Sequence, residues 1–435
     1  MNDIPRRKVL QWGIGAAGVG VLAACSPPAP APDPTTTTKA PSSLPTTSTS
    51  TTTTSTTTST TTTTTAPPPP PTSGRFLVVI DMAGGHDGYS MAIPYTDSSY
   101  YGRRPTVSVP ANQVLPAAAG IGLHPNLANV KNHPLALVHG VGHPNPDFSH
   151  FESIRRWWFG DTTGTVYPQY GFLGRICDII AQPNDAATGV SLGWGPTPAL
   201  SSANAVTLSQ DPYSNGTYST YGDPGMDAAW LAAQRAMSQE DRAEATMLFA
   251  GRTGIRTALH FSDLISAIPP STVTYPDTGL GAQLAATVRL LRADAGIRIV
   301  HVPFGASFDT HENHRATHDG IMTELDGALS AFLTELEGLG MSQKVLVATQ
   351  SEFGRRADQN ETGLDHGTAT MGMFAGAVHP GLYGTAANWK TLDTNGNLKA
   401  TVTMGEYLAT MANWLGVASG DVLSGAPTPL AGVTL

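Results

Sequence analysis

The chain has 435 residues, with 24 lysines and arginines against 33 aspartates and glutamates, which gives a formal charge of −9 at pH 7. This acidity argues against nucleic acid or an anionic membrane surface as the partner. The only cysteines are Cys25 and Cys177. If Cys25 is modified by lipid, no intrachain disulfide can form, and we expect Cys177 to be a small buried residue rather than a nucleophile.

Residues 1–25 have the form of an export signal. Arg6 and Arg7 precede an uncharged run that extends from residue 9 to 24, shorter than the about 20 residues of a membrane span. The arginine pair indicates twin-arginine export, and residues 22–25 resemble a lipoprotein cleavage box. An ordinary secretory signal is the alternative. We expect an exported protein, held on the outer face of the cell membrane or in the cell envelope by lipid on Cys25 alone.

Residues 26–74 consist almost wholly of threonine, serine, proline and alanine. Such a segment has too few apolar side chains to offset the entropy lost on ordering, so we expect a disordered linker. The remaining segment, residues 75–435, is long enough for one large α/β domain. It shows no second linker and no internal repeat.

Short apolar runs alternate with helical periodicity along residues 75–435. The expected strands are residues 76–80, 135–138, 298–303, 344–349 and 371–375. The expected helices are residues 151–159, 226–249, 253–268, 280–293, 321–339 and 405–415. Strands separated by helices favour an α/β fold with a doubly wound, largely parallel sheet and helices on both faces.

Acidic and histidine side chains follow the expected strands. In an open α/β sheet, ligands collect outside the carboxyl ends of the strands. Aspartate and histidine are usual ligands of zinc and other divalent ions, and we expect these strand ends to converge on one site. The residues at these positions are Asp309, His311, Glu352, Asp365 and His366. Any one of the histidines alone is more often a surface or core residue than a ligand.

Ser149 and Arg355 are the candidate catalytic side chains. Ser149 precedes the expected helix 151–159, where backbone N–H groups favour an anion. A plain helix cap, with a typical effect of about 1 kcal/mol, competes with the role of nucleophile. Arg355 could bind a phosphate or sulfate in bidentate fashion, or belong to a salt bridge at a strand end. The G-x-S-x-G pattern at residues 189–193 lacks the following helix that a nucleophile elbow needs, so we expect no catalytic serine there.

Several motifs together resemble one large bacterial family, domain of unknown function 1501, whose members are commonly exported by twin-arginine signals. The resemblance covers residues 75–435. It implies the fold of the alkaline-phosphatase and sulfatase superfamily, with a metal site at strand ends and a metal-activated serine, threonine or cysteine that attacks a phosphate or sulfate ester. The motifs are residues 81–88, Ser149-His150-Phe151, Phe308-Asp309-Thr310-His311, Ser351-Glu352-Phe353-Gly354-Arg355 and Asp365-His366-Gly367.

The resemblance also implies individual roles. Asp81 or Asp87 would be the metal aspartate of the first strand, and Ser149 the nucleophile. Asp309 with His311 would supply one ligand pair, and His366 the late histidine. Glu352 departs from the pattern, because Ser351-Glu352 stands where the superfamily has an Asp-His pair.

Two hypotheses follow. The first is a cell-surface hydrolase of phosphate or sulfate esters, small or polysaccharide-borne, that uses zinc, manganese or calcium held by the acids and histidines named above. The second is a non-catalytic cell-envelope protein that keeps the fold and binds wall polysaccharide or another surface component. The clustering of acids and histidines favours the first, and Glu352 at the position of the Asp-His pair favours the second.

Overall fold

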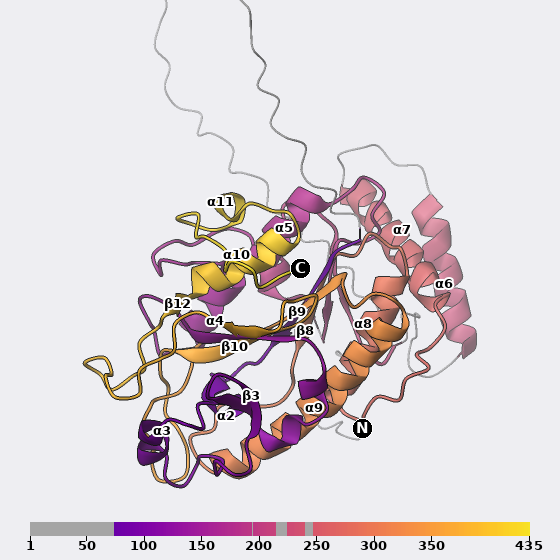
Figure 1. Ribbon diagram of the computed structural model, residues 1–435. Helices are drawn as coiled ribbons and strands as arrows, with labels where there is room; N and C mark the ends of the chain where they lie inside the picture. Colours follow the sequence, from indigo (N-terminus) through magenta and orange to yellow (C-terminus); the bar gives the residue numbers. More distant parts are fainter. Residues whose placement is uncertain (1–73, 194, 215–223, 240–246) are drawn as a thin grey trace, which may run out of the picture.

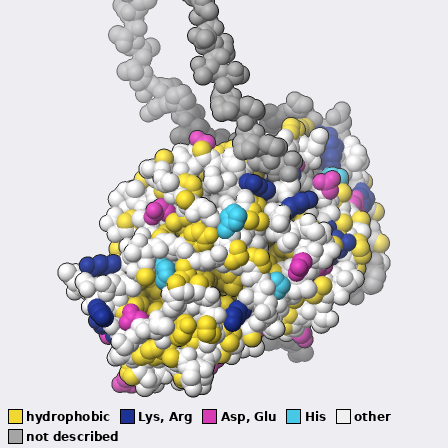
Figure 2. All heavy atoms as spheres, viewed as in Figure 1, with side chains coloured by type: hydrophobic (Ala, Val, Ile, Leu, Met, Phe, Trp, Pro, Cys, Tyr) yellow, Lys and Arg dark blue, Asp and Glu magenta, His cyan; other side chains and the backbone are white. Residues whose placement is uncertain are grey.

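The computed structural model describes residues 74–193, 195–214, 224–239 and 247–435 (Figure 1). The expected export signal, the lipidated Cys25 and the linker up to residue 73 lie outside the described residues. No helix among those described is long and apolar enough to cross a membrane. On the face shown in Figure 2, lysine and arginine side chains are scattered among uncharged ones rather than gathered in one basic patch.

A nine-stranded sheet runs through the molecule in the order β11-β5-β10-β9-β1-β8-β6-β7, with β12 paired to β5. Within it only β10 pairs antiparallel with its neighbours, so the sheet is mostly parallel. The strands are β1 (Phe76–Asp81), β5 (Leu135–Gly142), β6 (Gly189–Leu192), β7 (Thr207–Gln210), β8 (Ile299–Pro303), β9 (Val345–Gln350), β10 (Thr370–Gly376), β11 (Gly381–Tyr383) and β12 (Val402–Thr403).

Helices cover both faces of this sheet (Figure 1). Alternate residues of β1 point to opposite sides: Val78 and Ile80 pack with α8 (Gly279–Arg292) and α9 (His314–Gly338). Leu77 and Val79 pack on the other side, among the helices that form the second core. These are α4 (His150–Phe159), α5 (Phe172–Ile180) and α10 (Met404–Trp414). Because β1 is buried on both faces, it is a continuous apolar run. The predicted doubly wound α/β fold is confirmed.

Smaller elements lie around this frame. Strands β2 (Ala92–Ile93), β4 (Ile121–Leu123) and β3 (Leu115–Ala118) form a second, three-stranded sheet. The remaining helices are α2 (Gly88–Met91), α3 (Ser98–Arg103), α6 (Pro224–Gln239), α7 (Met247–Ser266) and α11 (Ser419–Val422).

The predicted elements differ from the observed ones mainly at their ends. The predicted break near residue 251 is wrong, because α7 begins at Met247 and Gly251 lies inside it. Helix α9 begins at His314, earlier than predicted, after Asn313 in a left-handed conformation (φ 49°). The two short strands β6 and β7 were not predicted, because each has only four residues.

The sheet topology determines where a site can form. Strands β1, β5, β8 and β9 run in one direction, so their carboxyl ends share one edge of the sheet. Because β10 runs the other way, the segment before it arrives at that same edge. The loops after β1, β5, β8 and β9 and the loop before β10 therefore converge at this edge of the sheet. Ligands collect at such edges in open α/β sheets.

Candidate metal centre

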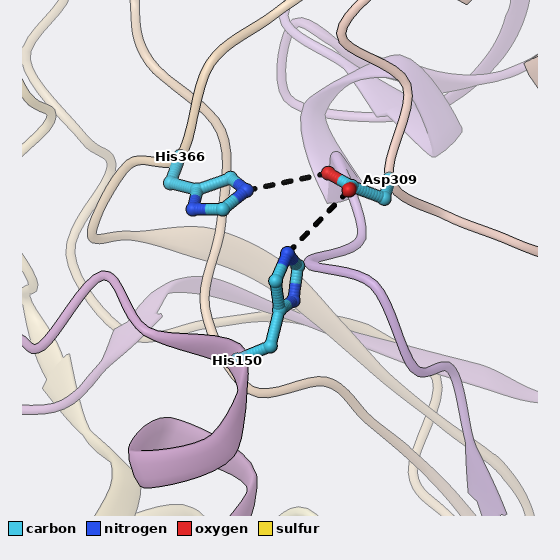
Figure 3. A group of neighbouring side chains, drawn as sticks. All are labelled: His150, Asp309 and His366. Atoms are coloured by element: carbon cyan, nitrogen blue, oxygen red, sulfur yellow. Dashed lines mark hydrogen bonds and ion pairs between the residues drawn. The ribbon is translucent and has the colours of Figure 1, made fainter.

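Three side chains meet at this edge: His150, Asp309 and His366 (Figure 3). One ligand atom from each lies within 4.8 Å of the other two. His366 Nε2 is 3.3 Å from Asp309 Oδ1, and His150 Nε2 is 3.5 Å from Asp309 Oδ2. His150 starts α4, Asp309 follows β8, and His366 precedes β10, so segments distant in sequence build one cluster.

His311 adds a third imidazole to this group. Its Nε2 atom is 3.1 Å from Asp309 Oδ1 and 2.9 Å from His366 Nε2. We call His150, Asp309, His311 and His366 the open cluster, because all four side chains are partly exposed to solvent. Of the predicted metal ligands, the structure brings Asp309, His311 and His366 together.

The Nδ1 atom of each histidine in the open cluster contacts an oxygen outside the cluster. His150 Nδ1 lies 2.9 Å from Glu352 Oε1, and His311 Nδ1 lies 2.9 Å from Asp365 Oδ1. His366 Nδ1 lies 2.8 Å from the carbonyl oxygen of Phe148. A carbonyl or ionised carboxylate can only accept a hydrogen bond, so each Nδ1 donates and each neutral imidazole presents its Nε2 lone pair inward.

This arrangement fits a divalent cation. In metal sites, histidine ligands donate their other ring N–H to a carboxylate or a carbonyl, which fixes tautomer and orientation. The inward lone pairs of His311 and His366 face each other at 2.9 Å, a contact that a proton or a cation between them would make favourable. Together the cluster offers three nitrogens and a carboxylate, a donor set typical of zinc.

The charges of the cluster are set by its surroundings. Burial acts to raise the pKa of Asp309, but the hydrogen bond and charge of Arg355 outweigh it and lower that pKa below its ordinary value. Burial also lowers the pKa of His366. The hydrogen bond from His311 lowers the pKa of Asp365. At neutral pH the two carboxylates are therefore ionised and His366 is neutral, as metal binding requires.

Arg355 is fully buried and its guanidinium is already occupied. It donates to Asp309 Oδ1 at 2.6 Å and to the carbonyl oxygens of Gly85 at 2.7 Å and Leu364 at 2.8 Å. It also donates to the carbonyl oxygens of Gly84 and Phe308. The guanidinium therefore ties the strand-end loops together and fixes Asp309, and its side chain is closed off from solvent.

Glu352 and Asp365 lie behind the open cluster rather than within it. Each contacts the Nδ1 atom of a histidine, as described above. Glu352 is buried, and its carboxylate also accepts hydrogen bonds from Gly84 N at 2.7 Å and Ser351 Oγ at 3.1 Å. Both carboxylates were predicted to be metal ligands, but in the structure each contacts a histidine of the open cluster from behind instead of joining the cluster.

Asp81 and Asp87 are held elsewhere by other partners. Asp81 Oδ2 accepts from Trp158 Nε1 at 2.9 Å and lies 3.3 Å from His301 Nε2. Asp87 forms a buried bidentate ion pair with Arg104, at 2.6 and 3.1 Å. Burial acts to raise the pKa of Asp87, but the guanidinium of Arg104 outweighs it and lowers that pKa to about 2. Neither carboxylate joins the open cluster.

A second group of histidines lies beneath the same edge. We call His86, His124, His314 and His318 the buried cluster, since all four are almost fully enclosed. The rings of His86 and His318 stack, with their Nε2 atoms 3.4 Å apart, and those of His314 and His318 also stack. Burial lowers the pKa of His86 and of His314 to about 4, and that of His318 also falls. These histidines are neutral at pH 7.

Ser149 lies exposed at the N-cap of α4, and its side chain forms no capping hydrogen bond. Its backbone N–H donates to Asp147 Oδ1 at 2.8 Å. Its sequence neighbours are both part of the site: the carbonyl oxygen of Phe148 contacts His366, and His150 belongs to the open cluster. Ser191, by contrast, is buried on β6, with its Oγ atom 3.2 Å from His301 Nδ1.

His150 is the member of the open cluster that sequence reasoning did not assign. It stands between the candidate nucleophile and the helix in the Ser149-His150-Phe151 motif. A histidine directly after a helix-cap serine at a strand outlet was the available signal. Cys177 is buried on α5 as predicted.

Comparisons with known proteins give the following similarities. Among solved structures, the lipoteichoic acid synthase LtaP from Listeria monocytogenes is similar, with 9% identity over 83% of this chain and 76% of the other, at a TM-score of 0.38. The phosphonate monoester hydrolase of Agrobacterium radiobacter shares 10% identity over 79% of this chain and 74% of the other, at a TM-score of 0.34. The alkaline phosphatase of the Antarctic bacterium TAB5 shares 12% identity over 78% of this chain and 98% of the other, at a TM-score of 0.32. Such low TM-scores do not bear on activity.

No curated protein matches the sequence. The model of one protein family of unknown function, DUF1501, matches residues 75–425. That match includes every strand of the large sheet and every residue of the open cluster. The chain therefore belongs to the DUF1501 family.

Proposed function

We propose that this protein is a metal-dependent hydrolase of phosphate or sulfate esters. The observation that supports the proposal most directly is the convergence of three histidine Nε2 atoms on the carboxylate of Asp309, with every Nδ1 atom bonded outward. A structural histidine has no need of this arrangement, whereas a metal ligand does. The open position of the cluster also leaves room for a substrate.

The donor set favours zinc, or a transition metal with similar preferences, over calcium. Imidazole nitrogens suit zinc, and a catalytic zinc site has three protein ligands with a further position left for water or substrate. Calcium instead takes 6–8 oxygen ligands. His150, Asp309 and His366 would be the three ligands, with His311 beside them as a fourth imidazole.

In this proposal the chain supplies three further functions. Ser149 Oγ gives up its proton and attacks the phosphorus or sulfur atom, and the ester oxygen leaves and takes up a proton as the alcohol. Water then cleaves the Ser149 ester, which releases phosphate or sulfate and restores the hydroxyl. The free backbone N–H groups at the start of α4 bind an anionic oxygen of the ester. Arg355 keeps Asp309 ionised and in place. A bound divalent cation supplies polarisation of the ester and a lower pKa for the attacking hydroxyl.

The test uses the full-length chain, purified without chelator. We expect near-stoichiometric zinc or a similar metal by mass spectrometry, and hydrolysis of at least one phosphate or sulfate monoester. Asp309→Ala and His366→Ala should remove both, and Ser149→Ala should remove hydrolysis while keeping the metal. His379→Ala, an exposed histidine near the end of β10, is the matched control. A folded wild-type protein that takes up no metal would reject the proposal.

The same experiment separates the enzyme from a non-catalytic binding protein. The rival predicts saturable binding to cell-wall material and no turnover on any ester, whether or not metal is present. An exposed serine directly before His150 of the open cluster favours the enzyme, because it can supply a nucleophile that a binding protein does not need.

Export and lipid anchoring remain a proposal that rests on the sequence of residues 1–25. Labelled palmitate should be incorporated into the wild-type protein and not into the Cys25→Ala variant. Incorporation that survives this change would rule out Cys25 as the anchor.

A further inference from the structure

Glu352 is the most enclosed carboxylate in contact with the open cluster. Its side chain is 1% exposed, whereas that of His150, which it contacts, is 35% exposed. Its two carboxylate oxygens have three hydrogen-bond partners. Oε1 accepts from Gly84 N and contacts His150 Nδ1, and Oε2 accepts from Ser351 Oγ. Burial of a carboxylate is costly unless its oxygens accept hydrogen bonds in this way.

The partners of Glu352 are themselves fixed. Its own carbonyl oxygen accepts a hydrogen bond from Trp157 Nε1 at 3.0 Å, which ties the loop after β9 to α4. Ser351 Oγ lies 2.7 Å from the carbonyl oxygen of Met82, after β1. The carboxylate is therefore rigidly placed by two strand-end loops and the helix that bears His150.

Asp365 offers an internal comparison. It contacts His311 Nδ1 at the same distance, 2.9 Å, but its side chain is 52% exposed. Its second side-chain partner is Asn360 Nδ2 at 3.3 Å. Solvent competes for this carboxylate and screens its charge, so the two histidines are held with unequal firmness.

We propose that Glu352 is a positioning residue, which fixes the tautomer and the orientation of His150 and thereby sets the affinity of the open cluster for a divalent cation. The inference rests on the proposed function for the identity of the ligand, although the tautomer of His150 can be tested without metal. Asp365 positions His311 in the same way, with a smaller effect on the affinity for the cation.

Two variants separate the acceptor from its charge. Glu352→Gln keeps an oxygen that can accept from Gly84 and His150, while its amide nitrogen can donate to Ser351 Oγ. Glu352→Leu removes every acceptor. We expect the glutamine variant to keep the Nδ1–H tautomer of His150, and the leucine variant to lose it.

The metal-free full-length chain is examined first, by long-range ¹⁵N–¹H NMR of the histidine rings. The wild type and Glu352→Gln should show His150 protonated on Nδ1 alone, and Glu352→Leu should show protonation on Nε2 as well. Zinc affinity is then measured by competition with a chelating dye. It should fall roughly 10- to 100-fold in Glu352→Leu, the range found for the loss of outer partners of metal-bound histidines, and less in Glu352→Gln and Asp365→Asn.

Glu406→Gln is the control, because that glutamate caps α10 and has no contact with the open cluster. It should change neither the tautomer nor the affinity. An unchanged His150 tautomer and unchanged zinc affinity in both Glu352 variants would overturn the inference and leave the proposed function intact. Failure of the wild type to bind zinc would instead reject the proposed function, while the NMR result would still decide the role of Glu352. If Glu352→Leu does not fold, the affinity of Glu352→Gln relative to the control decides.

Discussion

The open cluster and the buried cluster lie at the same edge of the sheet and have similar compositions, yet their chemistry differs. In the open cluster, Asp309 has exposed oxygens and three imidazoles direct lone pairs toward it. In the buried cluster, both neighbouring carboxylates are already paired: Arg104 neutralises Asp87, and Arg315 pairs with Asp319, which lies 2.7 Å from His124 Nε2. His314 there contacts hydroxyl groups through both ring nitrogens. A gathering of histidines is thus not itself a metal site; an available carboxylate makes the difference.

One short segment contributes to both clusters. Asp309 and His311 point into the open cluster, while Thr310 between them points the other way, with its Oγ1 atom 2.6 Å from His314 Nδ1. The backbone turns tightly at Asp309, where the Thr310 N–H donates to the carbonyl oxygen of Phe308 at 2.9 Å, and adjacent side chains face different clusters. This alternation allows adjacent positions to be changed with separate consequences, which makes the comparison testable.

The largest effect is expected for Asp309→Asn in the open cluster. Loss of the anionic ligand should remove bound metal and reduce ester turnover by more than ~10³-fold, because metal polarisation is worth several kcal/mol in the transition state. Thermal stability should change little, since Arg355 keeps its carbonyl partners. The measurement is metal content and turnover, with Asp277→Asn, an exposed aspartate after α7, as the control. Full activity in Asp309→Asn would show that the open cluster is not the site.

The second-largest effect is expected for Asp87→Ala, which changes a carboxylate beside the buried cluster. This change leaves the guanidinium of Arg104 buried without its counter-ion, which should cost about 3–5 kcal/mol in the free energy of unfolding. Molecules that fold should still bind metal in full. The matched control is Asp358→Ala, which removes an exposed partner of Arg103 and should cost less than about 1 kcal/mol. Equal losses in the two variants, measured by urea unfolding, would contradict this account.

Acid should destabilise the protein through the buried cluster. The pKa of His86 and of His314 is about 4 in the folded state against 6.5 in the unfolded chain. Because the folded-state pKa is the lower one, the unfolded chain takes up protons first as the pH falls below 6.5. Stability should be constant above about pH 7 and fall between pH 6.5 and 4, by about 3 kcal/mol per histidine at most. Urea unfolding at several pH values measures this.

The double variant His86→Gln, His314→Gln should flatten that dependence, because glutamine does not titrate in this range. Replacement of the exposed His379 by glutamine should leave the pH dependence of stability unchanged. A double variant that is as acid-sensitive as the wild type would place the titrating groups elsewhere.

Much of the fold was predictable because buried parallel strands are continuous apolar runs, as β1, β8 and β9 are. Their shared direction put Asp309 and His311, which follow β8, at the edge where the loops after β1 and β9 also end. His366 reaches the same edge because β10 runs the other way, which a largely parallel sheet did not predict. The roles of Asp87 and Glu352 were not predictable in this way. Arg104, the partner of Asp87, lies 17 residues further on with no motif between them, and Glu352 lies behind His150 because of loop packing that no periodicity reveals.

The smallest effect is expected for Thr310→Val, between two residues of the open cluster. Valine has nearly the same shape as threonine but cannot bond to His314 Nδ1, so a buried hydrogen bond is lost at a cost of about 1–2 kcal/mol. Metal content and ester turnover should stay within about twofold of the wild type, because the Thr310 hydroxyl contacts the buried cluster rather than the open one. Turnover and urea unfolding are measured on the same preparation. A large loss of metal with little loss of stability would mean that the buried cluster positions Asp309, and that the two clusters act as one site rather than two.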